Sequence, residues 1–101
     1  MLVQFSFTPI GVGVSLSKYI AKAIKIVDES GLPYKLHAMG TIVEGQWDEV
    51  MSLIKKCRDA LMEDLERLLI EIKIDDRKGV TDTIEAKVKS VEEKLGKTIR
   101  K

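Results

Sequence analysis

Residues 68–74, Leu-Leu-Ile-Glu-Ile-Lys-Ile, decide the fold of this chain because they fit two kinds of secondary structure. A helix continuing from the preceding segment would explain the apolar residues at positions 61, 65, 68 and 72. Strict alternation of isoleucine with charged residues from Ile70 to Ile74 instead favours a strand, which is also the structure that β-branched residues prefer. We therefore interpret this segment as a strand that ends at the polar stretch 75–79.

Two further strand regions precede this segment. Residues 2–9 alternate apolar and polar side chains and end at Pro9, which predicts a strand with Val3, Phe5 and Phe7 on one face. Residues 34–39 and 41–44 also have strand character, and Gly40 between them predicts the turn of a hairpin.

Three segments have the apolar spacing of helices. The first covers about 16–27, with Ser15 or Ser17 as its cap and a stop at Gly31. The second starts near two acidic residues at 48 and 49 and runs to about residue 63. The third begins after Asp82, the predicted N-cap, and stops at Gly96. The predicted order is therefore β-α-β-β-α-β followed by a C-terminal helix, which is typical of an α+β, ferredoxin-like sandwich.

Length and composition limit the classes of protein. The chain has 101 residues, 45% of them hydrophobic and 33% charged, which predicts one globular domain over residues 1–101. Its formal net charge of +1 gives no electrostatic basis for binding nucleic acid or an anionic membrane. Cys57 is the only cysteine, and neither a signal peptide nor a long apolar run is visible, so we expect a cytoplasmic protein.

Two helices cover one face of a four-stranded sheet, so the other face should be open. Alternation predicts that this open face carries Gln4, Ser6 and Thr8 from the first strand, and Glu71 and Lys73 from the last. The same alternation assigns it Met39, Thr41 and Val43 from the hairpin, with Ile70, Ile72 and Ile74 directed inward. Such a mixed surface suits a subunit contact that encloses a small polar ligand, or a plain dimer interface.

Three stretches of the sequence are distinctive in combination. They are Leu-Pro-Tyr-Lys-Leu-His-Ala-Met-Gly-Thr-Ile-Val-Glu-Gly (32–45) followed by Trp47 to Val50, Ile-Lys-Ile-Asp-Asp-Arg (72–77), and Gly-Val-Ser-Leu-Ser-Lys-Tyr (13–19). Together they resemble the small thiamine-binding-protein family. The resemblance covers almost the whole chain. It implies a ferredoxin-like subunit that forms homodimers or homotetramers, binds thiamine or its hydroxymethylpyrimidine portion, and has neither catalytic activity nor a cofactor.

Thiamine chemistry then selects candidate ligand-binding residues. A carboxylate would offset the thiazolium charge and accept a hydrogen bond from the exocyclic amine, whereas thioether and aromatic side chains would cover the rings. The candidates are the carboxylates Glu44 and Glu71, the ring-covering side chains Tyr34, Met39 and Trp47, and the hydroxyls Ser6, Thr8 and Thr41.

Other functions have less support in the sequence. His37 is the only histidine and Asp75 and Asp76 are adjacent, so we predict no metal site and no catalytic residue. RNA-binding sheets expose aromatic residues, which this sheet is predicted to bury. The alternative that stays open is a regulatory or assembly domain whose sheet face only contacts another protein.

Overall fold

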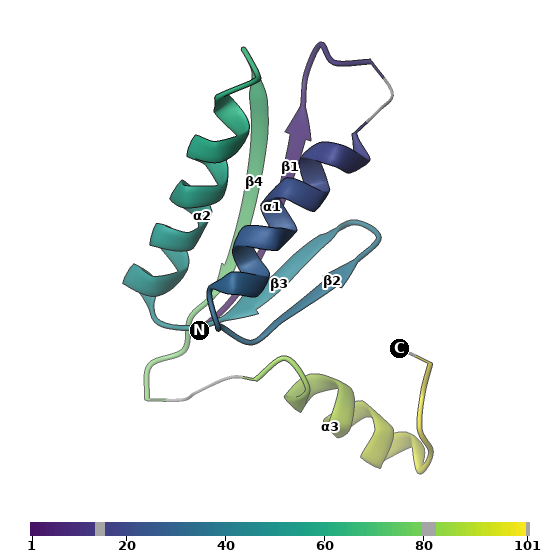
Figure 1. The fold of residues 1–101 in the computed structure, drawn as a ribbon. Helices are drawn as coiled ribbons and strands as arrows, with labels where there is room; N and C mark the ends of the chain where they lie inside the picture. Colours follow the sequence, from purple (N-terminus) through teal and green to yellow (C-terminus); the bar gives the residue numbers. More distant parts are fainter. Residues whose placement is uncertain (14–15, 80–82, 101) are drawn as a thin grey trace.

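The computed structural model describes residues 1–13, 16–79 and 83–100. Within these residues the elements are β1 (Leu2–Pro9), α1 (Ser17–Glu29), β2 (Tyr34–His37), β3 (Gly40–Glu44), α2 (Trp47–Met62), β4 (Leu68–Asp75) and α3 (Ala86–Leu95) (Figure 1). The order βαββαβ with an added C-terminal helix confirms the predicted α+β, ferredoxin-like fold. Segment 68–74, which decided the prediction, is indeed a strand.

The four strands form one antiparallel sheet in the order β2-β3-β1-β4. β1 is therefore central, and β2 and β4 are the two edges. Helices α1 and α2 lie next to each other on one face of this sheet, whereas α3 lies beyond one end of it (Figure 1). The sheet consequently has a helix-covered face and an open face.

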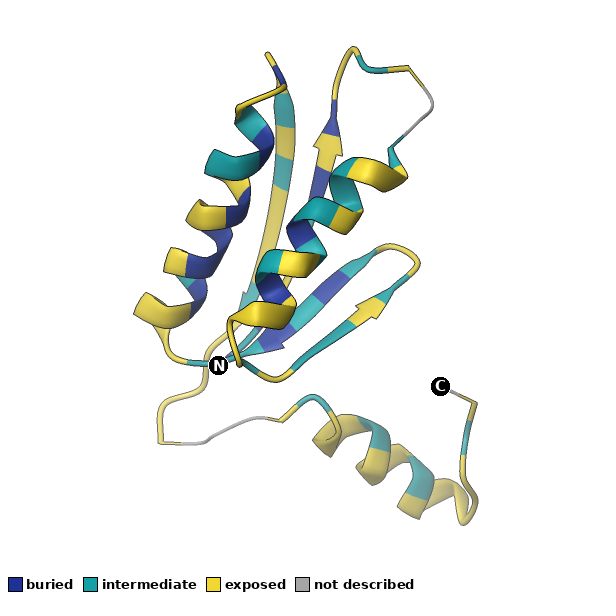
Figure 2. Cartoon of the chain, in the orientation of Figure 1, coloured by how far each residue is buried: buried dark blue, intermediate teal, exposed yellow. Residues whose placement is uncertain are grey.

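The core lies between the sheet and these two helices (Figure 2). β1 contributes alternate residues, as predicted, and the rings of Phe5 and Phe7 meet edge to face with centroids 5.5 Å apart. The fully buried core side chains are Val3, Val27, Val43, Val50, Cys57 and Leu61. Burial of apolar surface at these positions is the main source of stability for a domain of this size.

The predicted orientation of the hairpin is wrong. Val43 pairs with Val3, and Thr41 pairs with Phe5, so both hairpin residues face the helices. They are buried there, Thr41 at 4% and Val43 at 0% exposure. Ile42, which pairs with Gln4, takes the open face instead. Directly opposed residues of antiparallel strands share a face, so the pairing with β1 determines which hairpin side chains face the helices.

The predicted orientation of β4 is confirmed, with one difference in burial. Ile70, Ile72 and Ile74 pair with Phe7, Phe5 and Val3, and therefore share the helix-covered face. Ile72 nevertheless remains 39% exposed, on a strand that lies at the edge of the sheet.

The predicted helix ends have mixed outcomes. Leu16 occupies the N-cap position of α1 and Ser17 is already helical, so Ser17 is not the cap. The other two predicted caps, Ser15 and Asp82, lie outside the described residues. Gly31 follows α1 with a φ of 78°, and Gly96 ends α3 with a φ of 73°, as expected for glycine stops.

The Cys57 thiol gives a testable pH dependence of stability. It is fully buried where α2 packs on α1, and it donates a hydrogen bond to the Ala23 carbonyl oxygen at 3.6 Å. Burial raises its pKa from 9.0 to about 11. Between these two values the unfolded chain releases the thiol proton while the folded chain keeps it, so stability falls as the pH rises.

We expect the Cys57 thiol to contribute a loss on the order of 2 kcal/mol in the free energy of unfolding between about pH 9 and pH 11. Urea denaturation across this range measures that loss. Cys57→Ala removes the titrating thiol and should show a shallower decline. Identical declines in the two proteins would contradict this account.

Candidate functional site

The sheet is interrupted on one side of β1. β1 pairs with β4 along its whole length, from Leu2 to Pro9, but with β3 only from Leu2 to Phe5. β3 begins at Gly40, because the hairpin turns at Ala38 and Met39. On the β3 side, the second half of β1 therefore has no paired strand within the described residues, and a cavity of about 350 Å³ lies at this gap.

Four parts of the chain form the cavity wall. They are the second half of β1, one face of α1, the β2–β3 hairpin toward its tip, and β4, which contributes Glu71. The lining residues are Phe5, Ser6, Phe7, Thr8, Ile20, Ala23, Ile24, Leu36, His37, Ala38, Met39, Gly40, Thr41 and Glu71. Its volume, and a wall that combines apolar side chains with several polar groups, suit a small-molecule site.

Gly40 allows the hairpin tip to approach β1 closely. A β-carbon at this position would lie 3.0 Å from the Phe5 carbonyl oxygen, a contact tighter than nine in ten that real β-carbons make. A larger residue here would have to displace the backbone of β1 or of the turn. The shape of the cavity at this end therefore depends on the absence of a side chain.

Thr41 places a hydroxyl in the apolar part of the cavity wall. The residue is 4% exposed and opposes Phe5 on the helix-covered face. Among the residues that the structure describes, no hydrogen bond of this hydroxyl is found. Buried hydroxyls normally have a partner, so an unpaired one that faces a cavity is available to a ligand.

The polar side of the cavity comes from the open face of the sheet. Ser6 pairs with Glu71 across β1 and β4, and Thr8 is the next open-face residue of β1. A shallower hollow of about 270 Å³ on this face shares Ser6, Met39 and Glu71 with the cavity. Met39 is 82% exposed at the tip of the hairpin, between the two spaces. The cavity therefore continues onto the open face at these residues.

Five of the eight predicted site residues line this cavity, namely Ser6, Thr8, Met39, Thr41 and Glu71. Tyr34 lies in a neighbouring groove of about 700 Å³ between α1 and β2, which also contains Ile20, Ile24 and Leu36. Its hydroxyl donates to Asp28 Oδ1 at 2.8 Å, and this hydrogen bond raises the pKa of Tyr34. Tyr34 is thus held toward α1 rather than toward the gap in the sheet.

Glu44 and Trp47 lie at the other end of the hairpin. The Glu44 carboxylate accepts a hydrogen bond from the backbone N–H of Ile84 at 2.7 Å, which ties the segment before α3 to β3. Trp47 starts α2 and is 54% exposed. Neither residue lines the cavity, so the structure does not bring these two candidates together with the five that do.

Several lining residues were not predicted from the sequence. His37 is half-buried at the hairpin tip, and its Nδ1 accepts a hydrogen bond from the backbone N–H of Met39 at 3.4 Å. Ile20, Ala23 and Ile24 come from α1 and have the i, i+3, i+4 spacing of one helix face. Their apolar stripe was visible in the sequence, but its contribution to a cavity wall was not.

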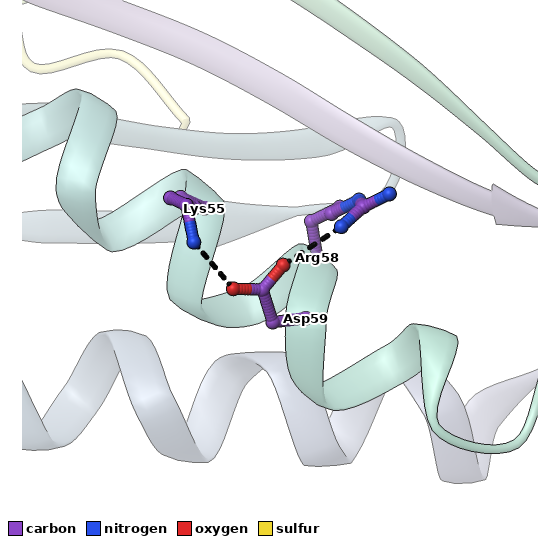
Figure 3. Close-up of polar contacts among 3 residues, drawn as sticks. All are labelled: Lys55, Arg58 and Asp59. Carbon is purple, nitrogen blue, oxygen red and sulfur yellow. Dashed lines mark hydrogen bonds and ion pairs between the residues drawn. The ribbon is translucent and has the colours of Figure 1, made fainter.

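A second polar cluster lies on the surface of α2, away from the cavity. Asp59 accepts hydrogen bonds from Lys55 at 2.8 Å and from Arg58 at 2.9 Å (Figure 3). Chiefly the Lys55 contact, and then the Arg58 contact, lower the pKa of Asp59. All three side chains are well exposed, so this is a surface ion-pair network that contributes little to stability.

Metal binding and membrane insertion are two further functions on which the described residues bear. No group of three or more His, Cys, Asp and Glu side chains is placed to hold a metal ion within ranges 1–13, 16–79 and 83–100. Across the same part of the chain, none of the helices has the length and apolar character needed to cross a bilayer.

Comparison with known proteins identifies relatives of this chain. A sequence model described as "Thiamine-binding protein" matches residues 3–92. A UPF0045 protein from Mycobacterium bovis is 42% identical over 96 residues, which cover 94% of each chain. A UPF0045 protein from Methanocaldococcus jannaschii is 37% identical over 93 residues, 92% of this chain and 93% of its own.

Solved structures agree with the fold. The crystal structure of the Methanocaldococcus jannaschii protein has a TM-score of 0.84 over 91% of this chain and 95% of its own. A Thermotoga maritima protein, described as a candidate thiamine biosynthesis/salvage protein, has a TM-score of 0.80 at 28% identity, over 89% and 96%. The family description names binding and no reaction. This chain belongs to the thiamine-binding protein family.

Proposed function

We propose that this protein binds thiamine, or a related compound with the same pyrimidine ring, in the cavity at the gap between β1 and the hairpin tip. The observation that carries the proposal is the cavity itself, which combines apolar walls with unpaired polar groups in a chain of this family. The description of the Thermotoga maritima structure, which refers to thiamine biosynthesis or salvage, adds support for this class of ligand.

The apolar wall suits a flat heterocyclic ring. Ile20, Ile24 and Leu36 line the cavity on the side of α1 and β2. Burying an aromatic ring against such side chains is favourable because apolar surface leaves water. The thioether of Met39 is exposed at the mouth and can contact the edge or face of a ring there.

The polar groups suit the rest of the ligand. Ser6, Thr8 and Thr41 offer hydroxyls that donate or accept hydrogen bonds. The Glu71 carboxylate has no ion-pair or hydrogen-bond partner among the described side chains, and it lines both the cavity and the open-face hollow. A thiazolium cation beside Glu71 would have its charge offset there. We therefore assign the carboxylate role to Glu71 and not to Glu44.

Thr41→Val tests the assignment of the Thr41 hydroxyl. Valine has nearly the same shape but no hydroxyl, so we expect a loss of ligand affinity of about tenfold. Stability should stay the same or rise slightly, because the hydroxyl has no partner among the described residues of the free protein. Isothermal titration calorimetry measures the affinity, and urea denaturation measures the stability. Unchanged affinity would exclude a role for this hydroxyl.

A thermal-shift titration with thiamine, thiamine phosphates and hydroxymethylpyrimidine tests the proposal as a whole. A ligand at 100 times its dissociation constant should stabilise the fold by about 2.7 kcal/mol. Glu44→Ala is the matched control for Glu71→Ala, since each removes one carboxylate but only Glu71 lines the cavity. We expect Glu71→Ala alone to reduce the shift given by thiamine. No shift with any of the compounds at millimolar concentration would reject the proposal and favour an assembly domain.

We further propose that a second copy of the chain covers the open face. This face carries apolar Leu2, Ile42 and Leu69 together with charges of both signs, such as Lys73 and Glu71. A surface with both signs can pair with its own copy in a two-fold arrangement. Sedimentation equilibrium at high protein concentration should give at least the dimer mass, and a monomer mass there would contradict this part of the proposal.

A further inference from the structure

The backbone of Phe7 lies where β1 loses its neighbour. The ladder between β1 and β3 stops at the pair of Phe5 with Thr41. Continued by two residues, it would place Met39 opposite Phe7, but Met39 belongs to the hairpin turn. Phe7 is paired on its other side with Ile70 of β4, so it is held in an extended strand.

The direction of the Phe7 backbone groups follows from the ladder. In an antiparallel pair, alternate residues exchange hydrogen bonds with each neighbour. The N–H of Gly45 donates to the Met1 carbonyl at 3.2 Å on the β3 side, and the N–H of Ile10 donates to the Arg67 carbonyl at 3.0 Å on the β4 side. Odd-numbered residues of β1 therefore direct their N–H and C=O toward β3. For Phe7, that direction is the gap.

These two groups have no partner within the described parts of the chain, although Phe7 is only 7% exposed and lines the cavity. The nearby N–H of Met39 is already used, since it donates to His37 Nδ1. Backbone groups in a buried setting almost always have a hydrogen-bond partner. An unpaired donor and acceptor side by side on a cavity wall are therefore a recognition element.

We propose that the N–H and C=O of Phe7 bind the amidine edge of a 4-aminopyrimidine ring. In such a ring an acceptor nitrogen is adjacent to an exocyclic amine donor, which complements one donor and one acceptor on a single extended residue. The ring would thus take the position of the missing strand residue, as peptides do when they add to a sheet edge. This inference rests on the proposed function and specifies which part of the ligand the cavity recognises.

Amide hydrogen exchange followed by NMR tests the inference. In the free protein, the Phe7 amide should exchange at least about 100-fold faster than the Phe5 amide, which is paired with Thr41 and serves as the internal control. Saturating hydroxymethylpyrimidine should protect Phe7 and leave Phe5 unchanged. Analogues that lack the amine, or that have carbon in place of the adjacent ring nitrogen, should each bind about tenfold more weakly.

The outcomes separate this inference from the proposed function. Suppose that hydroxymethylpyrimidine binds and that Thr41→Val weakens this binding. If the ligand then does not protect the Phe7 amide, and the analogues bind as tightly as hydroxymethylpyrimidine, the inference is overturned and the proposed function stands. If no aminopyrimidine compound binds, both fail. A Phe7 amide that exchanges as slowly as Phe5 in the free protein would also overturn the inference, because the group would then be already paired.

Discussion

Leu61→Ala is expected to lower the free energy of unfolding by about 3 kcal/mol, within the range of roughly 2–5 kcal/mol that such substitutions give. Leu61 is 0% exposed on α2, in the core beneath the sheet. The substitution removes buried apolar surface and leaves a cavity that the surrounding side chains fill only partly. For a domain of this size the melting temperature should fall by roughly 12–24 °C, as measured by calorimetry.

Leu95→Ala is the matched control. It makes the same chemical change on α3, where the leucine is 57% exposed. We expect its effect to stay within about 0.5 kcal/mol, as for most surface substitutions. Equal losses in the two variants would mean that α3 is packed as tightly as the core and would contradict the fold described above.

Ser6→Leu is expected to abolish ligand binding. Ser6 lines both the cavity and the open-face hollow, and its side chain lies beside Glu71 on the neighbouring strand. A leucine here would fill space at the junction and remove a hydroxyl. We expect an affinity loss of about 100-fold or more, corresponding to about 2.7 kcal/mol, in calorimetric titrations with thiamine.

Ser52→Leu provides the control for Ser6→Leu. Ser52 is exposed on α2 and lines neither the cavity nor the hollow, so the same substitution should leave affinity unchanged. Circular dichroism of both variants checks that they fold. A folded Ser6→Leu variant that binds thiamine with full affinity would show that the ligand occupies another surface.

Most of the fold could be predicted because apolar residues recur along the sequence at the regular spacing of strands or of helices. β1 has the predicted bounds, residues 2–9, since alternation and the terminal proline agree there. For β4 the β-branched residues at period two outweighed a competing helical spacing. The prediction of two hairpin strands around Gly40 was also correct, although the observed strands end at slightly different residues.

Alternation could not predict which of the two sets of hairpin side chains faces the helices. In residues 41–44 both faces carry a residue that is acceptable in a core, Val43 on one and Ile42 on the other. Only the pairing of Val43 with Val3 decides which face meets the helices. This long-range register is a property of the folded sheet, and a shift by one residue reverses every side chain.

The candidate site was predicted in part for a related reason. Ser6, Thr8 and Glu71 follow from alternation along β1 and β4, and their place in the cavity depends on the same register. The cavity itself exists because the ladder between β1 and β3 stops at Phe5, two residues before Phe7. No local pattern marks that mismatch of strand lengths. Glu44 matched the expected chemistry, but its partner is the backbone of Ile84, far away in sequence.

The most direct test of the central claim is an NMR titration of ¹⁵N-labelled protein with thiamine, in which each amide reports binding near it. The account predicts saturable shifts at residues 5–8, 36–41 and 71, which surround the cavity. Amides near Glu44 and Trp47, at the far end of the hairpin, should stay unchanged. Saturable shifts confined to that far end, or no shifts at millimolar thiamine, would contradict the claim that this cavity is the binding site.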